Sequence, residues 1–229
     1  MLSVAFLFAL LAALSCAAPN KLSKTAQNKG WQLLFDGQTT KGWHAYNQKG
    51  TTGWAAKDGE LIALGQEGGS HDIVSDEIFG DFDLSIEWKI APGGNSGIFF
   101  NVVESPQYEA IYATGPEYQL VDDLGFPQKL EDWQKTAANY AMHPPMKNAL
   151  RPVGQYNLTR LIVQKGHVEH WLNGEKIVEY QLWSPEWENL VKAGKWKDYP
   201  MYGRAKRGHL ALQDHGKQTW FKNIKIRAL

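Results

Sequence analysis

Hydrophobic and polar residues alternate along much of the chain, which is typical of strands with one buried face. In residues 81–90 (DFDLSIEWKI), apolar side chains occupy every second position. Successive side chains of a strand point to opposite faces, so this segment predicts a half-buried strand. Its charged positions, Asp81, Asp83 and Glu87, are expected to form a solvated face.

Turn sequences separate several further strands. Residues 96–102 (SGIFFNV) follow the turn APGGN and predict a hairpin with residues 81–90. Residues 158–164, 167–172 and 175–180 predict a meander. Its last turn, Asn-Gly at 173–174, is a strong hairpin signal because both residues tolerate positive φ.

The segment 208–227 predicts two strands joined by a polar turn. In the first strand Leu210 and Leu212 are expected to be buried. The intervening positions, His209, Gln213 and His215, then share the open face with Ala211. Polar groups on a sheet face of this kind point to a small-molecule site.

One helix is predicted, with Ser184 as its N-cap, Pro185 at the first helical position and its end at Gly194. Residues 123–152 are rich in proline and predict a long loop over one face of the sheet. Loops of this length are usually functional or disordered. The loop is expected to be ordered, because it contains Trp133 and Tyr140.

These elements predict one all-β domain over residues 30–229, built as a two-sheet antiparallel sandwich with one short helix. The chain has 229 residues, a length that sandwiches reach undivided. Its 24 Lys and Arg residues balance its 24 Asp and Glu residues, which argues against a nucleic-acid partner. The oligomeric state cannot be read from the sequence.

The first 18 residues are expected to be a targeting segment. Residues 2–14 are apolar, too short to span a bilayer, and end in Ser15-Cys16-Ala17-Ala18. Two alternatives stand: a lipid anchor on Cys16, or cleavage after Ala17 or Ala18. Either predicts export, to the periplasm or outer membrane if the source is bacterial. Residues 19–29 are expected to form a loose polar tether.

Three groups of polar residues are candidates for chemistry. Residues 115–123 (GPEYQLVDD) place Glu117 and Gln119 on one strand face, with Asp122 at the strand end. Residues 94–97 (GNSG) contain Asn95 between glycines that permit close backbone approach. The third group is the turn at residues 213–215. Each has a plain alternative: a solvent-facing glutamate, a turn asparagine and a turn histidine.

Several enzyme classes are disfavoured. The sequence contains no glycine-rich phosphate loop, HExxH motif or serine elbow. A laminarinase-type glucanase needs E-x-D-x-x-E on one strand, and Asp81, Asp83 and Glu87 have the wrong spacing. A retaining glycosidase built on a carboxylate pair is therefore not expected.

The chain resembles the 3-keto-disaccharide hydrolase family over about 200 residues. The resemblance rests on LFDG…GW at 34–43, GDFDLSIEWKI with GGNSGIFF, EYQLVDD, HVEHWLNGEKIVEY, and GHLALQDHG with FKNIKIR. It implies a concanavalin A-like jelly roll and cleavage of a sugar oxidised at C3. A C3 ketone acidifies the hydrogen on C2, so a base can remove it and the C1 oxygen can leave by elimination. Addition of water would complete a net hydrolysis.

Roles follow from the positions that match the family. His215 is assigned proton transfer, because imidazole titrates near neutral pH. Glu117 orients it or acts as a second acid–base group, and Asp122 completes the catalytic set. Asn95, Gln119 and Gln213 are expected to hold hydroxyls and the enolate oxygen, with Tyr140 and Trp133 lining the substrate site. As an alternative, Glu117, Asp122 and His215 would hold a divalent metal. His71 is given no role. The resemblance also implies that the 123–152 loop shapes specificity through Trp133, Tyr140 and His143, with simple loop packing as the alternative.

Two non-catalytic readings remain open. The same sandwich also serves as a sugar-binding module, because fold does not dictate function. An interaction domain of a surface complex would expose a broad apolar patch.

Overall fold

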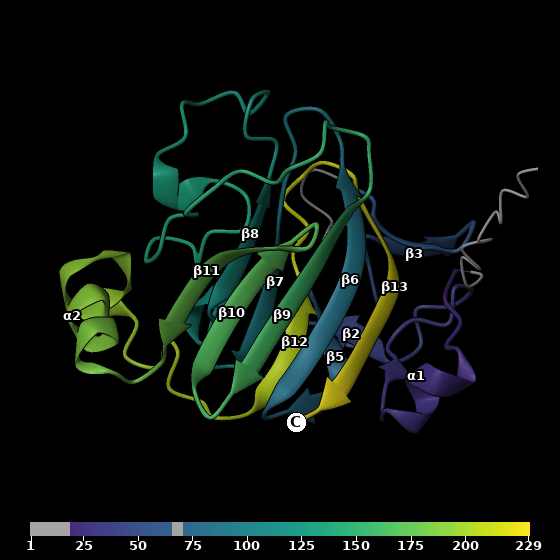
Figure 1. Cartoon of the computed structure of the whole chain (residues 1–229), viewed down its shortest axis with the longest axis horizontal. Helices are drawn as coiled ribbons and strands as arrows, with labels where there is room; N and C mark the ends of the chain where they lie inside the picture. Colours follow the sequence, from purple (N-terminus) through teal and green to yellow (C-terminus); the bar gives the residue numbers. More distant parts are fainter. Residues whose placement is uncertain (1–18, 66–70) are drawn as a thin grey trace, which may run out of the picture.

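The computed structural model describes residues 19–65 and 71–229, which form two antiparallel β-sheets packed face to face (Figure 1). This confirms the predicted sandwich. The expected targeting segment and Cys16 lie outside the described residues.

One sheet has eight strands and forms the front layer of Figure 1. Its order is β11 (Glu175–Gln181), β10 (His167–Leu172), β9 (Asn157–Gln164), β6 (Phe82–Ile90), β13 (Thr219–Ala228), β4 (Glu60–Ala63) and β3 (Trp54–Lys57). The short strand β1 (Gln32–Leu33) also pairs with β13.

The second sheet has five strands and lies behind the first. Its order is β2 (Trp43–Ala45), β5 (Ile73–Phe79), β12 (Gly208–Leu212), β7 (Asn95–Val102) and β8 (Glu117–Val121). The described helices are α1 (Lys24–Asn28) and α2 (Pro185–Ala193), with 3-10 turns η1 (Ile111–Ala113), η2 (Asp132–Gln134) and η3 (Lys195–Asp198).

The main core lies between the two sheets. Strand β6 buries all five of its alternating apolar residues, as its pattern predicts. Trp88 is fully buried and donates its indole N–H to the Thr159 hydroxyl, 2.9 Å away. Burying a large apolar side chain contributes ~1.5–3 kcal/mol, so this strand stabilises the sandwich strongly.

The predicted meander of β9, β10 and β11 is confirmed by their pairing. The predicted hairpin of residues 81–90 with 96–102 is wrong. Strand β6 pairs with β9 and β13, whereas β7 pairs with β12 and β8 in the other sheet. The chain crosses between layers at residues 91–94. Strand β7 then lies between β12 and β8 in the second sheet, where nearly its whole length is buried. Strands β12 and β13 are likewise in different sheets.

The expected solvated face of β6 also needs correction. Asp83 is 1% exposed and accepts hydrogen bonds from two guanidinium groups. Arg160 Nε lies 2.7 Å from Asp83 Oδ1, and Arg227 Nη2 lies 2.7 Å from Asp83 Oδ2. Two arginines from the neighbouring strands β9 and β13 therefore cover this carboxylate.

Helix α2 confirms the predicted helix. The Ser184 hydroxyl accepts the Trp187 backbone N–H, Pro185 opens the first turn and Gly194 is the C-cap. The expected loose tether is in part ordered, since it contains α1 and the buried residue Asn20. Asn20 exchanges hydrogen bonds with Asn223 and donates to the Gly59 carbonyl.

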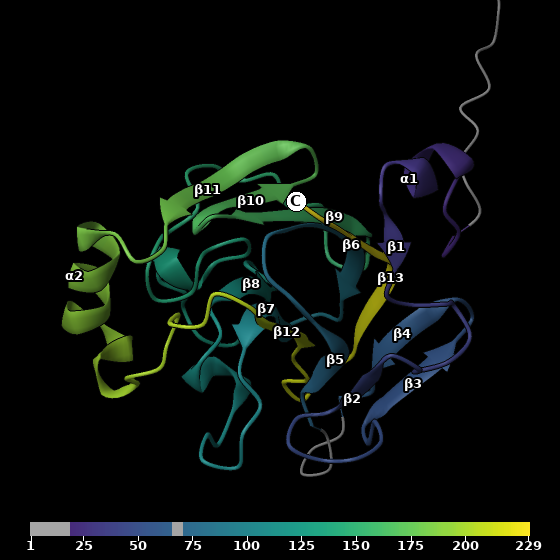
Figure 2. The ribbon, with the colours of Figure 1, turned by 90° about the horizontal axis from the view of Figure 1, so that it is seen from below.

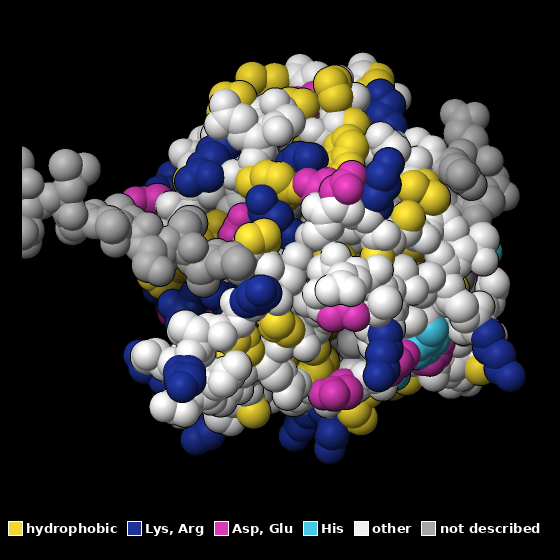
Figure 3. Space-filling model, turned by 90° about the vertical axis from the view of Figure 1, so that its right-hand side faces the viewer, with side chains coloured by type: hydrophobic (Ala, Val, Ile, Leu, Met, Phe, Trp, Pro, Cys, Tyr) yellow, Lys and Arg dark blue, Asp and Glu magenta, His cyan; other side chains and the backbone are white. Residues whose placement is uncertain are grey.

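Basic and acidic side chains are interspersed on the right-hand side of the molecule in Figure 1, which Figure 3 shows face-on. This matches the zero formal net charge of the chain. In the described part of the chain, no helix has the length and hydropathy needed to cross a membrane.

Candidate active site

The candidate site lies on the outer face of the five-stranded sheet, away from the sandwich core. Strand β8 alternates: Tyr118 and Leu120 belong to the main core, and Glu117 and Gln119 point to the other side. Figure 2 shows this sheet as the lower layer, with the connection from β7 to β8 projecting beyond it. The expectation that Glu117 and Gln119 share a face is consistent with this arrangement.

Glu117 is the most perturbed carboxyl of this face. It is 6% exposed, and burial raises its pKa to about 8. The nearby ammonium of Lys195 opposes this shift, and the charge of Asp72 adds to it. Glu117 is therefore mostly protonated at neutral pH and can donate or accept a proton there.

Gly97 makes room for this carboxyl. A Cβ at Gly97 would lie 2.5 Å from Glu117 Oε1 and 2.7 Å from the Phe99 ring. The glycine was expected to let a ligand approach the backbone. It instead lets the Glu117 carboxyl lie over strand β7.

Lys195 begins the 3-10 turn after α2, and its ammonium lies among aromatic rings. The Nζ atom is 4.7 Å from the ring centres of Tyr140 and Trp196 and 5.6 Å from that of Tyr112. Burial lowers the pKa of Lys195, while the charge of Glu117 acts in the opposite direction. The arrangement places a cation beside the buried carboxyl, held by cation–π contacts.

An aromatic stack supports this end of the site. Tyr202 lies between Trp196, at 4.0 Å, and Trp187, at 5.7 Å, with nearly parallel rings. The Tyr202 hydroxyl is buried without a hydrogen-bond partner among the described residues, and its pKa is raised by burial and by the charge of Glu117. The stack fixes the turn that carries Lys195 and brings a free hydroxyl near Glu117.

Asp72, just before strand β5, is a second perturbed carboxyl, and its charge acts on Glu117. Burial raises the pKa of Asp72 to about 7, the Asp214 backbone N–H lowers it, and the charge of Asp214 raises it. The Asp214 N–H lies 3.1 Å from Asp72 Oδ1. The face thus contains two carboxyls that titrate near neutral pH, and such groups cluster at functional sites.

The 123–152 segment is ordered against the free edge of β8. Gln119 exchanges backbone hydrogen bonds with Ala137 and Ala138, and the Tyr140 N–H donates to the Glu117 carbonyl. The Tyr140 ring thereby contacts the Lys195 ammonium. Trp133 packs edge-on against the Tyr140 ring, with 5.5 Å between the ring centres. His143 instead stacks on Tyr180 at 4.7 Å, within the aromatic stack.

Three predicted substrate-binding residues belong to this part of the sheet. Gly97 pairs with Gln119, and the Gln213 N–H donates to the Gly97 carbonyl at 3.0 Å. Asn95 begins β7, and its side-chain oxygen is buried without a partner in the described structure. Gln119 is 3% exposed and its Oε1 accepts the Leu120 N–H.

Asp122 and His215 are placed differently from Glu117. Asp122 is buried and its oxygens accept the backbone N–H groups of Gly93 and Gly125, at 2.7 and 2.8 Å. It therefore holds a turn. His215 is exposed in the turn after β12.

The alternative metal set is not brought together. Within residues 19–65 and 71–229, the group of three potential ligands that converges is His167, Glu169 and Glu179, on β10 and β11. Glu117, Asp122 and His215 do not belong to it, and the Asp122 oxygens already bind backbone N–H groups. These residues therefore do not fit a metal centre.

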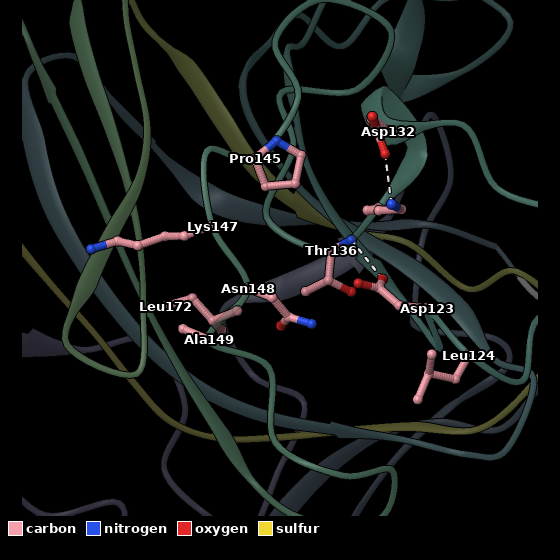
Figure 4. Close-up of a pocket in the computed structure, with 10 residues that line it drawn as sticks. Asp123, Leu124, Asp132, Thr136, Pro145, Lys147, Asn148, Ala149 and Leu172 are labelled. Carbon is pink, nitrogen blue, oxygen red and sulfur yellow. Dashed lines mark hydrogen bonds and ion pairs between the residues drawn. The ribbon is translucent and has the colours of Figure 1, made fainter.

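A pocket of about 400 Å³ is lined by residues of the 123–152 segment and by Leu172 of β10 (Figure 4). Its polar groups bind one another: the Thr136 N–H donates to Asp123, and Lys135 pairs with Asp132. None of the residues predicted for the site lines this pocket, so it is separate from the Glu117 face.

Sequence reasoning missed Lys195 and Asp72. Lys195 follows a predicted helix end and has no local signal. Asp72 directly precedes a buried strand, a position at which polar side chains approach a sheet face, but its partner Asp214 is 142 residues away.

Known proteins are similar to the chain over nearly its whole length. Residues 30–227 match the family described as 3-keto-alpha-glucoside-1,2-lyase-like domain. A relative named 3-keto-disaccharide hydrolase, from Bacteroides thetaiotaomicron, is 32% identical over 244 residues, which cover 94% of this chain and 84% of the relative.

Solved structures agree. A crystal structure of a glycosyl hydrolase candidate from Parabacteroides distasonis has a TM-score of 0.87 and 38% identity, covering 93% of this chain and all of the other. The carbohydrate-binding module CBM66 of Bacillus subtilis, at 12% identity, has a TM-score of 0.51 over 82% of this chain and 96% of its own, and shows the fold alone. By its match over residues 30–227, the chain belongs to the family of 3-keto-alpha-glucoside-1,2-lyase-like domains.

Proposed function

We propose that this protein cleaves 3-keto-glycosides, with 3-keto-disaccharides as its substrate class. The family membership and the name of the Bacteroides relative support the reaction class. The observation that carries the proposal is the buried Glu117 carboxyl. Its pKa is raised to about 8, and the Lys195 ammonium lies near it. A proton-transfer group works best when its pKa lies near the working pH.

The proposed reaction begins with removal of the C2 hydrogen as a proton. The C–H electron pair forms a C2=C3 double bond, and the C3 carbonyl becomes an enolate. When the enolate collapses, a C1=C2 double bond forms and the C1–O bond breaks. The leaving oxygen takes a proton and departs as an alcohol. Water then adds its oxygen to C1 and a proton to C2, which gives the 3-keto sugar and completes a net hydrolysis.

The residues of the outer face are proposed to divide this work. Glu117 transfers a proton at the sugar, and the Lys195 ammonium stabilises the enolate oxygen. His215 is the proposed second proton-transfer group. Asn95, Gln119 and Gln213 are proposed to hold hydroxyls.

Tyr140, with Trp133 behind it, is proposed to pack against the sugar ring, since aromatic faces suit the apolar side of a sugar. Asp122 receives no chemical role, because its oxygens already accept the backbone N–H groups of Gly93 and Gly125.

The test incubates the purified protein with a 3-keto-glucoside and measures release of the aglycone. We expect release by the wild type and a loss of about 10²–10⁴-fold in Glu117→Gln, the usual range for one acid–base group. Glu179→Gln, which changes an exposed carboxyl on β11, serves as the matched control and should keep full activity.

Unchanged turnover in Glu117→Gln would remove Glu117 from the reaction. Binding of the sugar without any product, in the wild type with and without chelator, would favour the sugar-binding module instead. A chelator-sensitive reaction would point to a metal that these residues do not hold.

We also propose that the protein is exported. The support is the apolar run at residues 2–14 followed by the small residues 15–18. N-terminal sequencing of the mature protein separates the two alternatives: a blocked, lipid-bearing Cys16 that is lost in Cys16→Ser, or a free terminus after Ala17 or Ala18. Recovery of the uncleaved chain from the cytoplasm would contradict export.

A further inference from the structure

Two pockets meet at Glu109, on the segment between β7 and β8. The acidic pocket, of about 340 Å³, is lined by Tyr46, Asn47, Gln48, His71, Asp72, Glu109, Ala110 and Asp214. The second pocket, of about 310 Å³, includes Glu109, Tyr108 and Tyr199. Both volumes lie at the lower end of the range typical of small-molecule sites.

The acidic pocket adjoins the Glu117 carboxyl. Asp72 lines the pocket, and its charge raises the pKa of Glu117. The Asp214 N–H binds Asp72, and the preceding residue, Gln213, binds Gly97, over which the Glu117 carboxyl lies. A ligand that extends from Glu117 past Asp72 would enter this pocket.

The walls of the acidic pocket are held in place by direct hydrogen bonds. The Tyr46 hydroxyl lies 3.2 Å from the Val103 carbonyl and 3.3 Å from the Tyr108 carbonyl. The Asn47 N–H lies 2.6 Å from Glu104, and its side-chain amide lies 3.0 Å from the Ser105 carbonyl. The segment that carries Glu109 is thus fixed to the residues that follow β2.

We propose that the acidic pocket is the subsite for the leaving group, and that it takes a neutral sugar. This rests on the proposed function, because it assigns the other half of the substrate. Carboxylates, amides and an imidazole supply the acceptors and donors that sugar hydroxyls need. The same carboxylates repel a leaving group that carries its own negative charge.

The pocket also distinguishes a sugar from an aromatic leaving group. Among the described residues that line the pocket, Tyr46 and His71 carry rings. The Tyr46 hydroxyl donates to backbone carbonyls. An aryl group cannot form the hydrogen bonds that sugar hydroxyls form with this polar lining, and a site built for hydroxyls discriminates against ligands that lack them.

The first experiment compares two substrates that share the keto sugar. One is a 3-keto-disaccharide that releases D-glucose, and the other is 4-nitrophenyl 3-keto-glucoside. We expect Glu109→Gln to lower kcat/KM for the disaccharide about tenfold or more. The aryl substrate should change less than about threefold, and the control Glu179→Gln should leave both unchanged.

Equal losses for the two substrates would overturn the proposal, since Glu109 would then act on the keto sugar or the bond. Thermal unfolding of each variant identifies loss of folding. If a variant does not fold, His71→Ala, which changes another residue lining the acidic pocket, provides the second comparison. It must likewise lower kcat/KM for the disaccharide more than for the aryl substrate.

The second experiment needs no turnover. D-Glucose and D-glucuronate are titrated into the wild type and Asp72→Asn by NMR. We expect glucose to bind the wild type about tenfold or more tightly than glucuronate, and the difference to shrink in Asp72→Asn.

Equal binding of the two sugars, or binding of neither, would contradict the proposed subsite. If the wild type cleaves neither keto substrate, the proposed function fails, and this titration still decides whether the pocket binds a neutral sugar.

Discussion

Each sheet has a buried carboxyl on its outer face, and the two carboxyls differ in whether cationic side chains pair with them. On the eight-stranded sheet, Asp83 is 1% exposed and is covered by the guanidinium groups of Arg160 and Arg227. On the five-stranded sheet, Glu117 is 6% exposed, and within the described residues it forms no ion pair. Its pKa rises to about 8 because burial disfavours its charge.

The difference shows that burial alone does not set the state of a carboxyl. A paired carboxylate remains charged and serves the fold, because its partners replace the lost water. A carboxyl without such partners holds its proton to higher pH and becomes available for proton transfer. Both residues sit at polar positions of alternating strands, so their partners decide their roles.

The largest expected effect concerns stability at neutral pH in Glu117→Gln. The pKa of Glu117 is 4.5 as an ordinary glutamate and about 8 in the fold. Its contribution to stability is therefore fully present below pH 4.5 and is lost as the pH rises through about 8. Glu117→Gln should raise the free energy of unfolding at pH 7 by on the order of 3 kcal/mol, with no gain near pH 4. Urea unfolding at both pH values measures this, and equal gains at both would contradict the assignment.

Asp83→Asn should have the opposite sign. Removing the charge leaves Arg160 and Arg227 without their shared carboxylate. We expect a loss of about 1.5–3 kcal/mol, the usual value for hydrogen bonds to charged groups, with turnover unchanged. Urea unfolding together with the 3-keto-glucoside assay checks both parts. A loss of activity in a folded Asp83→Asn protein would link the two faces, which the account keeps separate.

Gly97→Ala tests the space that the Glu117 carboxyl occupies. The added methyl would lie 2.5 Å from Glu117 Oε1 and 2.7 Å from the Phe99 ring. Overpacking of this kind costs about 1–3 kcal/mol, and displacement of the carboxyl should lower turnover. In a double-mutant cycle with Glu117→Ala, measured by thermal unfolding, the penalty should shrink. Independent effects of the two substitutions would show that the methyl does not meet the carboxyl.

The smallest expected effect is on the pH profile of Lys195→Gln, apart from the loss of turnover expected when the enolate oxygen loses its cation. The Lys195 ammonium lowers the pKa of Glu117, so its removal should move the alkaline limb of the pH profile of kcat/KM to higher pH. The shift should be small, because the Lys195 side chain is exposed to solvent, which screens its charge. Lys192→Gln, on the exposed side of α2, is the control. A shift to lower pH would contradict the placement of Lys195 beside Glu117.

Local patterns predicted much of the fold. Alternation identified β6 and the meander of β9, β10 and β11, and the sequence Ser184-Pro185 identified the start of α2. These features depend on neighbours in the chain. The assignment of β7 and β12 to the other sheet could not be predicted in this way, because it depends on strands distant in sequence.

The candidate site was predictable only in part, for the same reason. The period of a strand places Glu117 and Gln119 on one face. The approach of Asp72 to Asp214, and of Lys195 to Glu117, depends on the strand order β5-β12-β7-β8 and on the end of α2. The pKa of Glu117 depends on these contacts, so it could not be predicted from a local sequence motif.

The most direct test of the central claim is an NMR titration of the Glu117 side-chain carboxyl carbon in the folded protein. We expect a midpoint near pH 8. A midpoint near 4.5, the ordinary value for glutamate, would show a charged carboxylate at neutral pH and contradict the proposed proton-transfer group.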